Sequence, residues 1–253
     1  MGQQHSYRYQ KVYKQNLNFL PGSLVGNNVA SILGDIEGLR TQLGIERWVV
    51  AGGSTGAMLA LAYAADHPRR CLGLLLRGLW CLGQEELHYD YEDPRGKAIF
   101  FPKEWEALLQ HQSDPECSVV CSYHSLVTNT SIRWEERVRA ARAWLTWDCL
   151  GSSLSSPGGT LDMTDDEAVA TASIGLQLYV EVPKDPRYKS EVLVQRGAES
   201  VAQEKVPVGL VAGRWGLLLL FPFTFPQARH ALPSCLGCQV KRQGGRSRYV
   251  KKF

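Results

Sequence analysis

The 253-residue sequence contains no uninterrupted apolar run long enough to cross a membrane. The apolar stretch at residues 217–225 is interrupted by Pro222, and the first residues lack the apolar core of a secretory signal peptide. The formal net charge is only +3, so the composition does not indicate nucleic acid or an anionic membrane as a partner. We therefore expect a cytoplasmic protein without a nucleic-acid or membrane partner.

The sequence also lacks the cysteine and histidine spacing of a disulfide framework or a metal site. Its seven cysteines are scattered and odd in number, which is typical of proteins from a reducing cytosol. Cys117 and Cys121, and likewise Cys235 and Cys238, lie close together, but no histidines stand at ligand spacing beside them. Ordinary thiols are the better interpretation. We expect no metal and no cofactor.

One stretch, residues 47–63, has the pattern of an apolar strand, a glycine-rich turn and a helix. Gly52, Ser54 and Gly56 give the spacing G-x-S-x-G within it. In a nucleophile elbow the serine occupies a strained turn between strand and helix, so its neighbours have to be nearly free of side chains. Ser54 is therefore the candidate nucleophile. The alternative is a glycine-rich turn with a serine that has no chemical role.

The segments around this stretch predict a parallel sheet. Apolar residues at helical spacing predict a helix over residues 31–43, which Gly44 would end. Strands are expected at residues 48–51 and 71–76, with a helix over 55–65 between them. Because residues 71–76 are continuously apolar, we expect that strand to be covered on both faces.

After this sheet the pattern changes to helices. Residues 80–190 hold most of the tryptophans without a clear strand, and helices are expected over 134–150 and 162–179. A buried strand is expected again at residues 206–213. The fold class is therefore α/β, a mainly parallel sheet flanked by helices with an inserted helical cap. We expect core segments at 1–79 and 196–253, and the cap at 80–195.

Several segments in order resemble the proline iminopeptidases, also called prolyl aminopeptidases. These are serine peptidases of the α/β-hydrolase fold that release an N-terminal proline from peptides. The resemblance covers about two thirds of the chain and is carried by residues 35–40 (DIEGLR), 52–56 (GGSTG), 59–64 (LALAYA), 67–68 (HP), 74–78 (LLLRG), 99–105 (IFFPKEW), 140–147 (AARAWLTW) and 206–215 (VPVGLVAGRW).

The resemblance implies a role for three residues. Ser54 would attack the carbonyl of the N-terminal proline, and the backbone N–H of Thr55 would provide half of the oxyanion hole. Asp148 stands where the family has a glutamate that helps to hold the charged imino group of proline. For Asp148 the alternative is a solvated helix residue. The implied partners are small peptides with an N-terminal proline, and no oligomeric state is specified.

The sequence departs from the family at the residues that activate the nucleophile. Gly216 stands in the place of the catalytic aspartate, and Arg246 in the place of the histidine. Arginine cannot act as a base near neutral pH. His230 lies in a stretch expected to be helical and is not a substitute. We therefore expect impaired catalysis by this chain.

The front of the family pattern is missing as well. The His-Gly-Gly-Pro-Gly loop, which supplies the second oxyanion donor, should precede residue 30 and is absent, as are the strands before it. The expectation is a core with truncated N-terminal strands. A late start together with a shifted reading frame or a mis-joined exon, which is an incomplete gene model, would explain both altered ends. Two further interpretations remain: a non-catalytic binding protein with this fold, and an esterase-like hydrolase.

Overall fold

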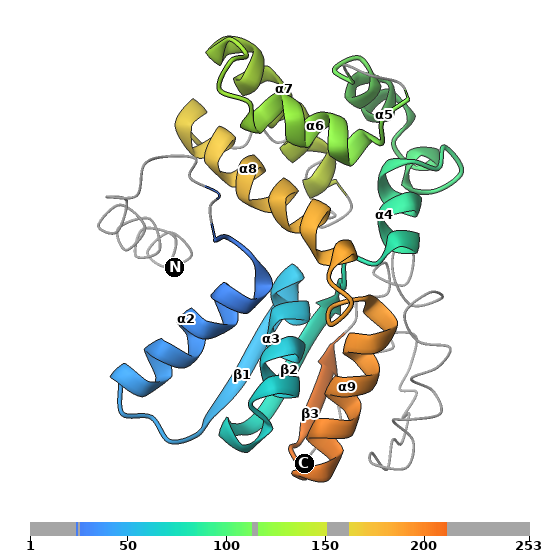
Figure 1. Ribbon diagram of the computed structural model, residues 1–253. Helices are drawn as coiled ribbons and strands as arrows, with labels where there is room; N and C mark the ends of the chain where they lie inside the picture. Colours follow the sequence, from blue (N-terminus) through green and yellow to red (C-terminus); the bar gives the residue numbers. More distant parts are fainter. Residues whose placement is uncertain (1–23, 25, 113–115, 151–161, 212–253) are drawn as a thin grey trace, which may run out of the picture.

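The computed structural model describes residues 24, 26–112, 116–150 and 162–211 (Figure 1). Its three strands form one parallel sheet in the order β1–β2–β3. The core elements are α2 (Val29–Gln42), β1 (Trp48–Ser54), α3 (Thr55–Asp66), the 3-10 turn η1 (Pro68–Arg70), β2 (Cys71–Leu79), α9 (Ser190–Gln203) and β3 (Val208–Val211). The predicted helices and parallel strands of this part of the chain are confirmed. The strand expected to be buried at residues 206–213 is β3, which is only half-buried and ends at the exposed Val211.

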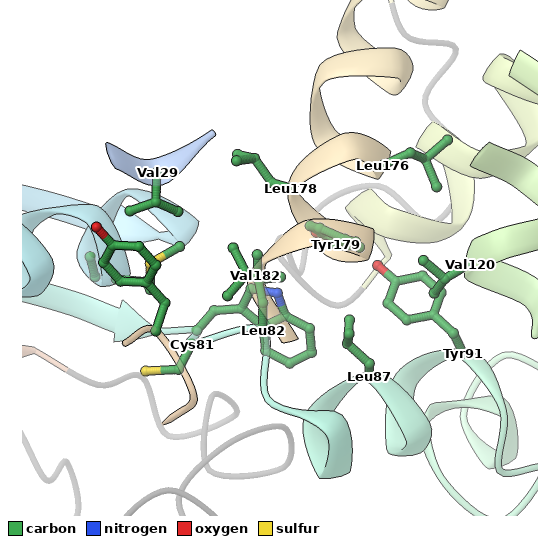
Figure 2. Packing of buried hydrophobic residues seen from close by; sticks show 14 of the residues in the cluster. Val29, Cys81, Leu82, Leu87, Tyr91, Val120, Leu176, Leu178, Tyr179 and Val182 are labelled. Atoms are coloured by element: carbon green, nitrogen blue, oxygen red, sulfur yellow. The ribbon is translucent and has the colours of Figure 1, made fainter. Parts of the chain in front are cut away.

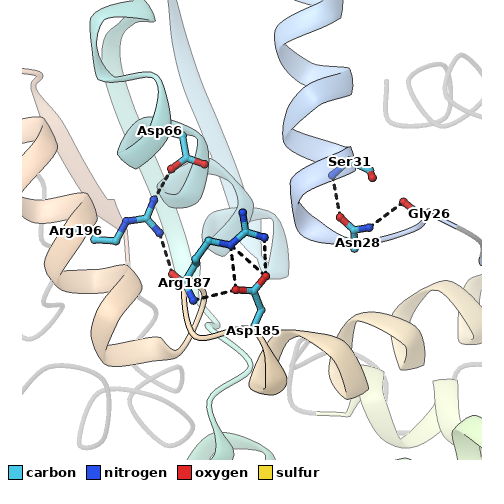
Figure 3. A network of polar contacts seen from close by, with 7 residues as sticks. All are labelled: Gly26, Asn28, Ser31, Asp66, Asp185, Arg187 and Arg196. Atoms are coloured by element: carbon cyan, nitrogen blue, oxygen red, sulfur yellow. Dashed lines mark hydrogen bonds and ion pairs between the residues drawn. The ribbon is translucent and has the colours of Figure 1, made fainter.

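Helix α2 has clear signals at both ends. Its N-cap is Asn28, whose side-chain oxygen accepts a hydrogen bond of 3.0 Å from the backbone N–H of Ser31 (Figure 3). Gly44 follows the helix with a φ of +66°, a left-handed conformation that glycine adopts without steric cost. Val29 and Leu33 are buried, but Leu39 is 51% and Leu43 59% exposed, so only the first part of the expected apolar face is covered in the described structure. The residues in the turns thus fix where α2 begins and ends.

Helix α3 covers one face of the sheet. It is rich in alanine and buried nearly all round, and it contacts β1, β2 and α9. Leu74 and Leu76 of β2 point to this face and are 2% and 3% exposed. Leu61 of α3 and Val201 of α9 line a small apolar cavity together with Leu74. The described core therefore lies between the sheet and these two helices.

The opposite face of the sheet is exposed in the described part of the chain. Val49 is 64% exposed, and Leu75 and Val211 are both 44% exposed. The strand register places Leu75 beside Ala51, and Arg77 beside Val211, on this second face. The prediction that residues 71–76 are covered on both faces is therefore wrong for the described structure. The physical reason is that α3 and α9 both pack on the face that holds Leu74.

The segment between β2 and α9 consists of helices in the described residues, without a strand, as predicted. They are α4 (Gln84–Tyr91), η2 (Lys97–Ile99), α5 (Pro102–Leu109), α6 (Val119–Thr128), α7 (Trp134–Cys149), α8 (Asp165–Glu181) and η3 (Val182–Lys184). The expected helices over 134–150 and 162–179 correspond to α7 and α8. No described helix combines the length and the apolar character needed to cross a membrane.

Core and cap share one hydrophobic cluster. At their junction Leu82, which follows β2, lies near Val182 and Leu178 at the end of α8 (Figure 2). Leu82 is fully buried, and Val182 is 2% exposed. Figure 1 shows the cap helices beyond the carboxyl ends of β1 and β2, which is where ligands bind in open α/β sheets. The fold thus places the cap over the end of the strand that carries Ser54.

Candidate active site

Ser54 lies at the junction between β1 and α3. It is the last residue of β1 and the N-cap of α3, with φ 56° and ψ −130°. A positive φ is uncommon for any residue other than glycine, and such strain concentrates at functional sites. Ser54 is also exposed. The predicted strand, sharp turn and helix are confirmed, and the backbone conformation is that of a strained elbow.

The two glycines of the motif have different roles. A Cβ atom on Gly52 would lie 2.0 Å from the backbone oxygen of Gly56, a distance that no real Cβ contact allows. A Cβ atom on Gly56 would meet no described atom within 4 Å. Within the described residues, the requirement for a missing side chain is therefore confirmed at Gly52 and not seen at Gly56. In this part of the chain the turn is tight on the strand side.

In the part of the chain that the structure describes, the amino end of α3 offers uncapped backbone N–H donors next to Ser54. Thr55 is the first residue of this helix, and the first N–H groups of a helix have no partner within it. The side chain of Ser54 does not cap them, and the first turn holds no acidic residue. The positive end of the helix dipole therefore lies next to Ser54.

Within the described residues, Ser54 makes no hydrogen bond to a side chain that could act as a general base. Of the described histidines, His67 caps the opposite end of α3, and His124 bonds to Gln177 in the cap at 2.8 Å. None of the hydrogen bonds in this part of the chain joins Ser54 to a histidine. Gly216, His230 and Arg246 lie outside the described residues.

Asp148 lies near the carboxyl end of α7, where two tyrosines hold it. The hydroxyl of Tyr179 donates to its Oδ1 atom at 2.9 Å, and the hydroxyl of Tyr91 donates to the same oxygen. Asp148 is half-buried, which differs from a fully solvated helix residue. Sequence reasoning missed both tyrosines, because they lie 57 and 31 residues from Asp148 and share no motif with it.

A buried ion pair lies beside this cluster. The Lys97 ammonium donates to the backbone oxygen of Trp147 at 2.8 Å and lies 3.7 Å from Oδ2 of Asp90. Burial raises the pKa of Asp90 to about 6 and lowers the pKa of Lys97. Within the described part of the chain, no group of His, Cys, Asp and Glu residues has an arrangement that could hold a metal ion.

Comparisons with known proteins agree with the resemblance seen in the sequence. Residues 5–106 match a family described as the alpha/beta hydrolase fold. The chain is 32% identical over 209 residues to a probable proline iminopeptidase of Leptolyngbya boryana, covering 82% of this chain and 62% of that protein.

Two further relatives carry the name proline iminopeptidase. One, from Xanthomonas citri, is 32% identical over 196 residues, which are 77% of this chain and 60% of that protein. The other, from Arabidopsis thaliana, is 32% identical over 160 residues, which are 62% of this chain and 41% of that protein. The chain thus spans less than two thirds of the length of these relatives.

Proposed function

The chain is an α/β-hydrolase-fold relative of the proline iminopeptidases, and on this premise we propose that it acts on peptides with an N-terminal proline through Ser54. The observation that carries the proposal is the backbone of Ser54, held at φ 56° between a parallel strand and the amino end of a helix. This conformation presents the hydroxyl at the carboxyl end of β1 and next to unpaired helix donors.

The reaction would form and then hydrolyse a prolyl ester. The Oγ atom of Ser54 attacks the prolyl carbonyl, the C–N bond to the next residue breaks, and the departing amine takes up a proton. Water then attacks the ester and releases proline. The N–H of Thr55 would donate a hydrogen bond to the oxyanion in both steps. Asp148 would accept a hydrogen bond from the charged imino group of the substrate.

The expected rate of hydrolysis depends on how well the hydroxyl of Ser54 can be deprotonated. In the resemblance, Gly216 and Arg246 replace the aspartate and histidine that would take up the serine proton. Loss of these groups in serine hydrolases costs several orders of magnitude in turnover. We therefore expect slow hydrolysis that still depends on Ser54.

The test is hydrolysis of a proline arylamide by the purified protein and by Ser54→Ala at equal concentration. We expect the release of arylamine by Ser54→Ala to fall to the uncatalysed level, because the attacking oxygen is gone. Ser122→Ala, which changes a buried serine of the cap, is the matched control and should keep the wild-type rate. Equal rates for the protein and Ser54→Ala would contradict the proposal.

Two additional readouts separate this function from the other interpretations. Faster turnover of simple esters than of the proline arylamide would favour an esterase. Ser54-dependent labelling by a phosphonate probe reports the nucleophile directly, without requiring a complete catalytic cycle. Absence of both labelling and hydrolysis, with retained binding of proline amide, would favour a binding protein.

A further inference from the structure

Asp148 is held where three cap helices meet. Asp148 belongs to α7, Tyr91 is the last residue of α4, and Tyr179 lies in the last turn of α8. Both tyrosine hydroxyls donate to the same carboxylate oxygen, Oδ1. These are the side-chain hydrogen bonds of Asp148 to described residues. The second carboxylate oxygen, Oδ2, can therefore accept a hydrogen bond from another donor.

The two tyrosine rings have little freedom to move. Trp144 stacks on Tyr91 with ring centroids 4.6 Å apart and an angle of 11°, and it meets Tyr179 edge-on at 5.7 Å. Tyr91 is 1% exposed and Tyr179 is 8% exposed. Because the hydroxyls are fixed by this packing, Asp148 is oriented before any ligand arrives, and less entropy is lost on binding.

This cluster lies at the base of the cap. Figure 2 shows Tyr179 beside Leu178 and Val182, which pack toward the core at Leu82, with Tyr91 on the other side of Tyr179. The two tyrosines that bond to Asp148 thus lie near the junction between the cap and the core.

The charges around Asp148 favour a cationic ligand. Lys97 and Asp90 form a buried pair whose charges offset each other, and both are less than a tenth exposed. The carboxylate of Asp148 is the remaining negative charge of the cluster, and it is half-buried. Burial raises the pKa of both tyrosines well above the usual value, so their hydroxyls keep their protons and remain donors.

We propose that Tyr91 and Tyr179 are positioning residues that hold Asp148 Oδ1 and direct Oδ2 to the charged imino group of the substrate. The inference rests on the proposed function, because it assumes that Asp148 receives this group. It goes further by assigning the selectivity for a charged amino terminus to two tyrosines outside any motif. The side chain of Asp148 is shorter than that of glutamate, and the two tyrosines thereby hold its carboxylate in one orientation.

The test measures binding, so that it does not depend on turnover. Prolinamide and N-acetylprolinamide, which lacks the positive charge, are titrated calorimetrically into the full chain and into Tyr91→Phe and Tyr179→Phe. We expect each variant to bind prolinamide about 5- to 10-fold more weakly, because a carboxylate that is no longer held in advance has to be immobilised on binding. Binding of N-acetylprolinamide should be weak and unchanged.

Tyr123→Phe is the matched control. Its hydroxyl is also buried in the cap and donates to the backbone oxygen of Leu108 at 2.6 Å, so the change removes a comparable hydrogen bond away from Asp148. We expect less than a 2-fold change in prolinamide affinity. An equal loss in Tyr123→Phe would overturn the inference, because the effect would then be a general loosening of the cap.

A double-mutant cycle separates positioning from stability. In an Asp148→Asn background, Tyr91→Phe should cause no further loss of prolinamide affinity, since the tyrosine acts only through the carboxylate. An additive loss would refute the positioning role. Prolinamide binding that depends on the tyrosines, in a chain without Ser54-dependent hydrolysis, would uphold the inference while the peptidase function fails. A chain that does not bind prolinamide at all would overturn the inference whatever Ser54 does.

Discussion

Lys97 shows how a charged side chain can be stabilised in the interior of the cap. It is 2% exposed, and its ammonium lies 4.9 Å from the centroid of the Trp147 ring in addition to its hydrogen bond with Trp147. Its ionic partner Asp90 has one oxygen, Oδ1, that is buried without a partner among the described residues. The hydrogen-bonding capacity of the pair is therefore only partly used. Removing either charge alone would leave the other one buried without its ionic partner, which is unfavourable.

This partial satisfaction leads to a prediction for single and double variants. We expect Lys97→Met and Asp90→Asn each to lower the free energy of unfolding by about 3 kcal/mol, because each leaves one buried charge unpaired. The double variant should recover most of that loss, since both charges are then gone. Urea denaturation followed by circular dichroism measures all four proteins. If the losses simply add in the double variant, the two side chains are not energetically coupled.

At the scale of elements, the turn between β1 and α3 determines where Ser54 points. The carbonyl of Gly56, in the first turn of α3, packs against the α-carbon of Gly52 on β1, so the helix starts in direct contact with the strand. Ser54 takes up the required change of direction with its positive φ. The strain at Ser54 is thus a consequence of how closely the two elements approach each other.

Two alanine substitutions test this close approach. Gly52→Ala forces the new methyl group against the Gly56 oxygen, so we expect a loss of about 2–3 kcal/mol in the free energy of unfolding. Gly56→Ala is the matched change on the helix side. It meets open space and removes a helical glycine, so we expect it to be neutral or slightly stabilising. Equal losses in urea denaturation would show that the contact between Gly52 and Gly56 does not define the turn.

The sequence predicts the single helices and strands better than it predicts how they pack against one another. Apolar spacing and capping residues identify α2, α3, α7 and α8 and the strands of the sheet, because these signals are local. The G-x-S-x-G motif identifies the elbow for the same reason. Tyr91 and Tyr179 could not be predicted, since their contact with Asp148 depends on how three cap helices pack and leaves no periodic pattern in the sequence.

At the scale of the whole molecule, the sequence pattern does not reveal which face of the sheet is covered. Leu74 and Leu75 are chemically identical neighbours in an apolar run, but only Leu74 is enclosed by α3 and α9. Burial of a strand depends on elements that pack against it from elsewhere in the chain. A continuous apolar pattern is therefore compatible with one covered face or with two.

Alanine substitutions of these two leucines test whether one face of the sheet or both faces are covered. Leu74→Ala removes a side chain that is 2% exposed and leaves a cavity, so we expect a loss of about 2–5 kcal/mol in the free energy of unfolding. Leu75→Ala changes a side chain that is 44% exposed and should cost about 1 kcal/mol or less. Both variants keep the strand register and lose the same atoms, so the difference in urea midpoint reports burial alone. Similar losses would mean that the second face of the sheet is covered in solution, as the apolar pattern of residues 71–76 predicts. A large difference would place the stabilising core on the side of α3 and α9, beneath the strand end that presents Ser54.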